Sequence, residues 1–444
     1  GTSVEKRKTT TRDMTQGNIV KQVLLFALPL MLGNVFQMLY NTVDSVVVGQ
    51  FVSTQALAAV GSTTMIVNML VFFFNGFSIG ASVVIGIHFG AKNMEKLHKA
   101  VETTIAATFV MCVAFTVIGY VGVVPMLRLM STPEDVFPEA TEYLHIYFAG
   151  FSGLLIYNMG SAVLRSVGDT TRPLYFLVLT SVLNIILDLV FVLVFHMGIA
   201  GVAIASILAQ AISAVMVVMS LSAESMEYRF RFRQMRFEGD ILSRTIRIGL
   251  PAGFQSIMYS LSNMLIQASV NRFGTDTVAS WVVLGKVDGI NWMILGALGI
   301  ASMTFVGQNY GAGRLDRIQK SLKLSLLIGV CISIVFGGAL LLFGWPLFGL
   351  FTSDDTVLAM SMQLLWYFAP FYWLFVPIEI ISGALRGMGD TLIPTIITAT
   401  GICVFRVAWI YTVVPLHNSM FTVSLSYPIS WVLTAIAFAI YYMI

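Results

Sequence analysis

Long apolar segments alternate with short polar ones along almost the whole chain. A membrane crossing needs ~20 apolar residues, and on that basis the pattern predicts twelve transmembrane helices. We place them near residues 19–50, 54–89, 96–123, 138–166, 172–195, 198–222, 241–272, 276–310, 317–345, 357–386, 391–415 and 419–443. The pattern therefore predicts an all-α polytopic membrane protein.

The composition supports this class of protein. Of the 444 residues 57% are hydrophobic and 11% are charged, whereas soluble domains carry roughly 25% charged residues. Cys112, Cys331 and Cys403 stand in apolar segments without CxxC spacing, so we expect neither a disulfide framework nor a metal site built on thiols. The chain has no P-loop and no Ser/His/Asp arrangement, so we expect neither an enzyme nor a bound cofactor.

The Lys and Arg residues predict the orientation. Of the 25, 21 lie in the segment up to Lys21 or in the loops after the second, fourth, sixth, eighth and tenth helices. The positive-inside rule then places both termini and these loops in the cytoplasm. We expect residues 1–18 to be a cytoplasmic segment, with Gly1–Ser3 left by cloning. Residues 223–240, rich in Arg, are expected to form a cytoplasmic linker that contacts anionic lipid rather than nucleic acid.

The chain contains an internal repeat. LPLMLGNVFQMLYNTVDSVVVGQF (28–51) aligns with LPAGFQSIMYSLSNMLIQASVNRF (250–273), and LRSVGDTTRP (164–173) aligns with LRGMGDTLIP (385–394). Each half holds an even number of predicted helices, so both halves run the same way through the membrane. We therefore expect two parallel pseudo-symmetric six-helix bundles, residues 19–222 and 241–444. Such bundles are typical of alternating-access carriers.

Three polar residues of the first half have apolar counterparts in the second. Asp44, Asn184 and Asp188 correspond to about Ile266, to Phe405 and to Trp409. Acids at membrane depth are costly, so they suggest a functional site. Asn184 and Asp188 lie one helical turn apart, and with Asp44 they could bind Na⁺ or share a proton. Ser206 could add a hydroxyl. The alternative is that the acids are structural hydrogen-bond acceptors.

The second half has unmatched charged residues of its own, which are Lys286, Asp288, Glu379 and Arg406. Two bases and two acids can neutralise one another at membrane depth. They form either a structural ion-pair network or the second wall of a polar cavity.

With these features the chain resembles the multidrug and toxic compound extrusion (MATE) family. The resemblance rests on the two six-helix halves, the opening of the first helix, the paired LRSVGDTTRP and LRGMGDTLIP loops, and the segment GQNYGAGR (307–314). It implies a secondary antiporter that expels amphiphilic, often cationic compounds in exchange for H⁺ or Na⁺. In the prokaryotic branch that this chain looks most like, the coupling residues map onto Asp44, Asn184, Asp188 and Ser206.

The same resemblance maps a proline in the first helix onto Pro29, which we expect to act as a hinge, and a polar cavity residue onto Gln37. With them we assign Met31, Val35, Tyr40, Asn41 and Asn158 to the substrate cavity. We expect a monomer in the cell membrane. The rival functions are a flippase of a lipid-linked or polar metabolite and, from a different class, a membrane receptor or scaffold.

Overall fold

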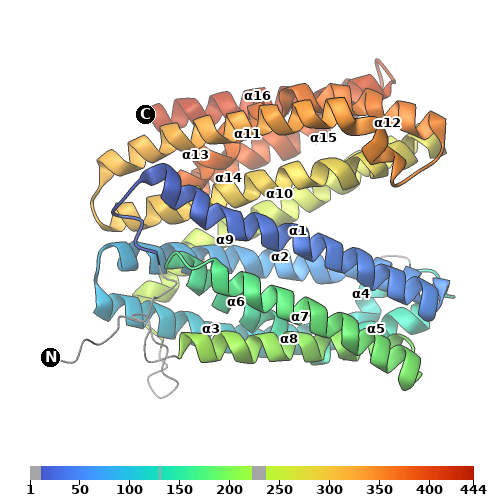
Figure 1. Cartoon of the computed structure of the whole chain (residues 1–444), viewed down its shortest axis with the longest axis horizontal. Coiled ribbons are helices and arrows are strands. Elements are labelled where there is room, and N and C mark those ends of the chain that lie inside the picture. The colour runs from blue at the N-terminus through green and yellow to red at the C-terminus, as the bar shows by residue number, and fades with distance from the viewer. Residues whose placement is uncertain (1–11, 130–131, 223–236) are drawn as a thin grey trace. The chain divides into compact units, whose positions relative to one another are not determined.

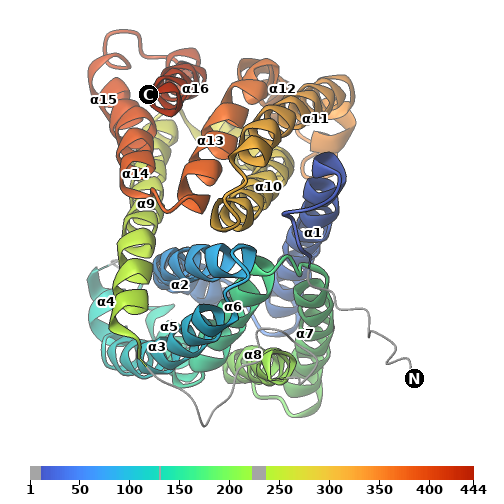
Figure 2. The same cartoon turned by 90° about the vertical axis from the view of Figure 1, so that its left-hand side faces the viewer.

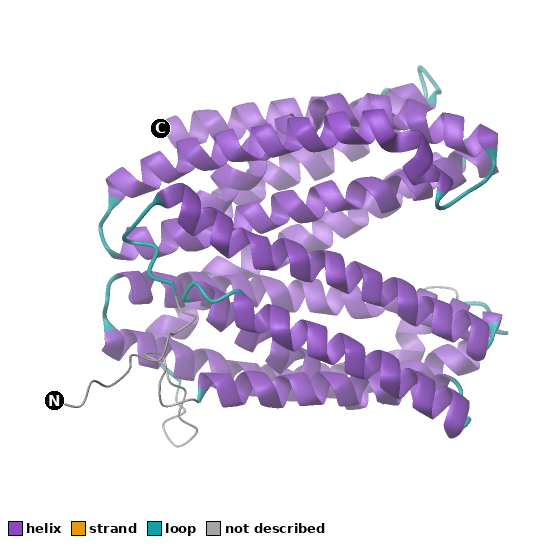
Figure 3. Cartoon of the chain, in the orientation of Figure 1, coloured by secondary structure: helices purple, strands orange, loops and turns teal. Residues whose placement is uncertain are grey.

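The computed structural model describes residues 12–129, 132–222 and 237–444, and every regular element in these ranges is helical (Figures 1 and 3). Ten of the described helices are long and apolar enough to cross a membrane, and α5 with α6 form an eleventh span bent by 53°. The one remaining predicted span, over 241–272, corresponds to α9. This helix is less apolar than the other spans and carries Gln255, Asn263 and Gln267. The prediction of an all-α polytopic membrane protein is confirmed.

The described residues of the first half form nine helical elements. They are α1 (Ile19–Phe51), α2 (Thr54–Gly90), α3 (Met94–Val121), α4 (Val123–Leu129), α5 (Phe137–Ala149), α6 (Ser152–Ser166), α7 (Thr171–Leu189), the π-helical η1 (Val190–Val194) and α8 (Ile199–Leu221). The helix predicted over 138–166 is therefore broken. Gly150 ends α5 at a point where a Cβ would lie 2.6 Å from Ile207, so the chain turns there beside α8.

The second half forms ten elements. They are α9 (Gly239–Asn271), α10 (Thr275–Gly311), α11 (Leu315–Gly349), α12 (Asp355–Phe368), the 3₁₀-helical η3 (Ala369–Phe375), α13 (Val376–Gly387), α14 (Leu392–Thr398), the π-helical η4 (Ala399–Val404), α15 (Phe405–Thr412) and α16 (Met420–Met443). Pro370 lies in η3 and Pro377 in the first turn of α13. Because proline lacks an N–H donor, the predicted helix over 357–386 tightens there.

The two halves repeat at the level of the backbone. Gly168 and Gly389, in the paired loops, both have positive φ angles, of 85° and 94°. In both loops the next residue is an aspartate whose N–H donates to a leucine carbonyl, Asp169 to Leu164 and Asp390 to Leu385. Glycine adopts this left-handed conformation without steric cost. The internal repeat predicted from the sequence is therefore present in the fold.

The chain divides into two compact units, and each takes the first turns of the other half's first helix. One unit comprises residues 1–13 and 28–250, and the other residues 14–27 and 251–444. We call them the N-terminal and C-terminal units. Figure 2 shows α2, α3, α6 and α8 of the N-terminal unit nearly end-on, as a bundle of roughly parallel rods. The chain changes unit directly before or one residue before a proline, Pro251 in α9 and Pro29 in α1.

Specific contacts hold the exchanged segments, residues 14–27 in the C-terminal unit and the start of α9 in the N-terminal unit. In the C-terminal unit the Met14 N–H donates to Oε1 of Gln308 at 2.8 Å, and Nη2 of Arg317 donates to the Met14 carbonyl at 2.8 Å. In the N-terminal unit a Cβ on Gly80 of α2 would lie 2.2 Å from the Thr245 carbonyl of α9. Each first helix is therefore built into both units.

Candidate functional site

Two carboxyl groups meet inside the N-terminal unit. Asp44 comes from the second half of α1 and Asp188 from the last turn of α7. Asp188 is fully buried, and its carboxyl group lies within hydrogen-bonding reach of that of Asp44. Neither oxygen of Asp188, nor Oδ1 of Asp44, accepts a hydrogen bond from a donor among the described residues. Two adjacent carboxylates repel each other in apolar surroundings, so a positive charge between them would offset the cost of burying the pair.

The other predicted members of this site lie on neighbouring helices. Asn184, one turn before Asp188 on α7, is only 2% exposed. Ser206 is buried on α8, which packs along α7, but among the described residues no hydrogen bond joins it to the carboxyl pair. The described structure thus brings Asp44 and Asp188 together directly, with Asn184 on the same helix face as Asp188.

Three polar side chains near the carboxyl pair were not anticipated from the sequence. Tyr143 and Tyr147 of α5 are both buried near Asp44, and their rings stack with centroids 5.8 Å apart. Nε2 of Gln210 on α8 donates to the Tyr147 hydroxyl at 3.2 Å. A signal was available, because the repeat aligns these three residues with apolar ones. Their counterparts in the second half are Leu364, Phe368 and Trp431.

A cavity of about 210 Å³ opens in the same unit. Its lining includes Pro29, Gln37, Asn158 and Asn184, all of them predicted site residues, together with Gln210. Through Asn184 and Gln210 the cavity reaches the neighbourhood of the carboxyl pair. Three residues that we assigned to the substrate cavity, Met31, Val35 and Asn41, are not among its lining residues, and the side chain of Tyr40 lies outside the described part of the chain.

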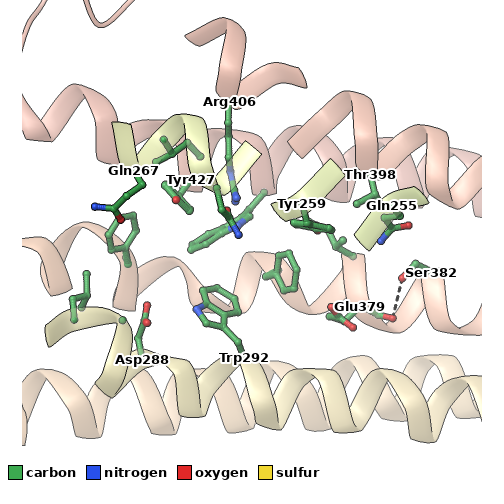
Figure 4. A pocket seen from close by; sticks show the side chains of 18 of the residues that line it. Gln255, Tyr259, Gln267, Asp288, Trp292, Glu379, Ser382, Thr398, Arg406 and Tyr427 are labelled. Carbon is green, nitrogen blue, oxygen red and sulfur yellow. Dashed lines mark hydrogen bonds between the residues drawn. The ribbon is translucent and has the colours of Figure 1, made fainter. Parts of the chain in front are cut away.

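The C-terminal unit contains a larger cavity, of about 560 Å³. Three of the four charged residues predicted to cluster there, Asp288, Glu379 and Arg406, line it. Lys286 does not, since its side chain is exposed and its Nζ lies 5.5 Å from the centroid of the Phe351 ring. Within the described residues no ion pair joins any two of these four side chains. Figure 4 shows Asp288, Glu379 and Arg406 on the cavity wall.

The duplicated helical halves, the membrane-spanning lengths and the cavities define a membrane transporter. A family model described as MatE matches residues 29–190 and again residues 251–412, one match for each half. The chain belongs to this family, the multidrug and toxic compound extrusion transporters, and not to an enzyme family.

Solved and curated relatives agree with this assignment. The chain is 30% identical over 399 residues to the probable multidrug resistance protein YoeA of Bacillus subtilis, covering 87% of this chain and 85% of that protein. It is 26% identical to an FAD transporter of Shewanella oneidensis, covering 77% and 76% of the two chains. A solved structure of the outward-facing conformation of a multidrug resistance MATE family transporter aligns with a TM-score of 0.89 at 22% identity over 98% of each chain. The predicted fold is therefore confirmed.

Proposed function

We propose that this protein is a secondary antiporter that exports amphiphilic, often cationic compounds in exchange for H⁺ or Na⁺. The observation that carries the proposal is the pair of adjacent carboxyl groups, the half-buried Asp44 and the fully buried Asp188, which meet in one half and are absent from its twin. The fold of the second half forms without them, so folding alone does not require them. The names of the multidrug resistance relatives support the substrate class.

The coupling ion binds between Asp44 and Asp188, with Asn184 as an oxygen donor for Na⁺ and Ser206 as an additional hydroxyl. Oxygen ligands of this kind suit a hard cation, and a shared proton neutralises the same pair. Asn184 belongs both to this site and to the lining of the adjacent cavity. Ion uptake therefore changes the charge next to a bound substrate in the same step.

Alternating access uses the first helix. Ion binding lets α1 bend at Pro29, where the missing N–H leaves a weak point in the helix. The helix face around Met31 and Val35 then moves toward the cavity and expels the substrate outward. One positive charge moving inward through 100 mV supplies ~2.3 kcal/mol, enough for a gradient of roughly tenfold to a hundredfold of a substrate without net charge. Export of a singly charged cation for one ion moves no net charge, so it is driven by the concentration gradient of the coupling ion instead.

The protein works as a monomer in the cell membrane, with both termini in the cytoplasm. The support for this orientation is the concentration of Lys and Arg in the N-terminal segment and in the loops after even-numbered predicted helices. The Arg-rich linker of residues 223–240, which lies largely outside the described residues, contacts anionic lipid.

Asp44→Asn tests the proposal. We expect it to abolish ethidium efflux from cells while leaving the amount of protein in the membrane unchanged, because the amide keeps the shape but not the charge. Asp276→Asn, at an exposed acid in the first turn of α10, is the matched control and keeps full efflux. Full efflux by Asp44→Asn would contradict the coupling role. Proteoliposomes given a pH or a Na⁺ gradient, one at a time, identify the ion.

A second candidate function is export or flipping of a polar metabolite or lipid-linked compound. The relative named as an FAD transporter favours it, because FAD is a polar aromatic anion. Competition of such a compound with ethidium for efflux by the wild-type protein separates the two functions. Strong competition supports a metabolite substrate, whereas the absence of competition supports the multidrug function.

A further inference from the structure

The cavity of the C-terminal unit is walled by aromatic rings. Trp292 of α10 and Trp431 of α16 lie with ring centroids 5.4 Å apart, and Phe368 lies 5.2 Å from Tyr427. At the positions of Tyr427 and Trp431, the first half has Ser206 and Gln210. The two halves have therefore specialised differently at equivalent positions. Flat faces of this kind bind aromatic rings by stacking and edge-to-face contacts.

A buried guanidinium reaches this cavity from one side. Arg406 on α15 is 5% exposed. Its Nε donates to Oγ of Ser430 at 3.0 Å, and its guanidinium carbon lies 3.9 Å from the centroid of the Tyr427 ring. No carboxylate of a described residue lies within 4.0 Å of it. Arg406 is thus a buried cation held in place by neutral groups and without a counter-ion.

A buried carboxyl group reaches the cavity from another element. Asp288 on α10 is 9% exposed and accepts a hydrogen bond, at 3.2 Å, from the Tyr372 hydroxyl. No cation of a described residue lies within 4.0 Å of it. In the view of Figure 4, Asp288 and Trp292 lie on the side opposite the point where Arg406 enters. The acid and the base are therefore not paired with each other, and they reach the cavity from different elements.

The end of the cavity away from Asp288 also carries a base and an acid, Arg386 and Glu379. Arg386 of α13 bonds to Gln255 of α9, but its Nε has no partner among the described residues. Glu379, on the same helix, packs against Gly299, where a Cβ would lie 2.6 Å from Oε2. Oγ1 of Thr398, a 1% exposed residue of the lining, also has no partner among the described residues. The cavity thus holds unused hydrogen-bonding groups and separated charges of both signs.

We propose that the C-terminal cavity is a ligand site for aromatic zwitterions, molecules with a flat ring body, an anionic group that pairs with Arg406 and a cationic group that pairs with Asp288. A buried charge without a partner is costly. A ligand with both charges pairs the two residues at once, whereas a singly charged ligand leaves one of them unpaired. A volume of about 560 Å³ suits a drug-sized molecule.

The inference deepens the proposed efflux function and rests on it only in treating the bound molecule as a substrate. Binding itself is independent of Asp44 and Asp188, which lie in the N-terminal unit. The two proposals can therefore fail separately.

Matched probes test the ligand class. Calorimetric titration of the purified full chain in detergent would compare 4′-(aminomethyl)biphenyl-4-carboxylate with 4-(aminomethyl)biphenyl and biphenyl-4-carboxylate. The one-ring series 4-(aminomethyl)benzoate, benzylamine and benzoate covers a shorter charge spacing. We expect one of the two zwitterions to bind about tenfold more tightly, or more, than both of its singly charged analogues. Equal binding of the cation, equal binding of the anion, or no binding in either series would overturn the proposal.

Two variants assign the contacts. Arg406→Gln should reduce the affinity of the zwitterion to about that of its cationic analogue, and Asp288→Asn to about that of its anionic analogue. Lys286→Gln, on the same helix as Asp288 but outside the cavity, and Arg272→Gln, at an exposed residue, are the matched controls and should leave the affinity unchanged. Because the wild-type comparison needs no variant, a misfolded Arg406→Gln protein leaves the test intact.

The same titration separates this proposal from the coupling site. Asp44→Asn should bind the zwitterion as tightly as the wild type even where its efflux is lost. Loss of zwitterion binding in Asp44→Asn would contradict a site confined to the C-terminal unit.

Discussion

At the scale of single residues, the two halves carry chemically different side chains at equivalent positions of the repeat. Asp188 is buried beside Asp44 in the first half, while the aligned position of the second half carries Trp409. Gln210 and Trp431 also occupy equivalent positions of the repeat. Gln210 lies near the carboxyl groups, and Trp431 lies in the wall of the aromatic cavity. One ancestral position has thus become polar in one unit and aromatic in the other.

Tyr147→Phe tests the polar shell of the carboxyl pair. The change removes the hydroxyl that accepts a hydrogen bond from Gln210, so we expect a loss of about 1 kcal/mol in the free energy of unfolding. This hydroxyl lies near Asp44, so its loss should weaken ion binding there. We therefore expect the ion concentration for half-maximal efflux to rise roughly twofold to tenfold.

The measurement for Tyr147→Phe is ethidium efflux from proteoliposomes over a range of pH and Na⁺ concentration. Tyr120→Phe, at an exposed tyrosine, is the control. An unchanged ion dependence in Tyr147→Phe would leave the tyrosine with a packing role only.

At the scale of elements, close helix crossings hold the cavity walls in place. In the C-terminal unit, α13 meets α10 at glycines, where a Cβ on Gly383 would lie 2.6 Å from the Gly299 carbonyl and one on Gly387 would lie 2.5 Å from the Met303 carbonyl. The same helix α13 carries Glu379 and Arg386 into the cavity. The small residues therefore set how far these charged groups stand from α10.

Gly383→Ala should destabilise the protein by about 1–3 kcal/mol, because the new methyl group meets backbone atoms that have no room to move. Gly338→Ala on α11 is the matched control, since nothing lies within 4 Å of its Cβ position. Thermal unfolding of both variants in detergent measures the effect. A melting temperature of Gly383→Ala equal to that of Gly338→Ala would contradict the close crossing.

The elements also show how far the sequence predicts this structure. Helix number, the repeat and the residues Asp44 and Asp188 follow from apolar length and from the comparison of the halves, because burial in a membrane restricts polar residues strongly. The break after Ala149 and the π-helical turns η1 and η4 do not follow, since they depend on neighbouring helices such as α8. The position of Lys286 outside the cavity depends on side-chain direction, which a count of charged residues does not contain.

At the scale of the whole molecule, the exchange of first turns makes the N-terminal segment part of the C-terminal unit. Arg317, 9% exposed, donates from Nη2 to the Met14 carbonyl at 2.8 Å and from Nη1 to the Gly17 carbonyl at 3.0 Å. Nδ2 of Asn309 donates to the same Met14 carbonyl at 3.0 Å. The cationic donor makes these contacts stronger than neutral hydrogen bonds.

Arg317→Ala should release this segment. We expect amide hydrogen exchange of residues 14–27 to become faster by roughly tenfold to a hundredfold, since hydrogen bonds from a charged donor are worth about 1.5–3 kcal/mol. Lys320→Ala, one turn further along α11 and exposed, is the control. Exchange in Arg317→Ala as slow as in the control would show that the segment is held by other contacts.

The same exchange sets an order in time. The ribosome makes Met14 294 residues before Gln308, the residue that accepts its N–H. The N-terminal unit, in turn, is complete only after the chain has been made as far as Leu250. The N-terminal unit therefore cannot be completed until synthesis has passed beyond its own half of the sequence, and Met14 waits for the second half before it can reach its partner.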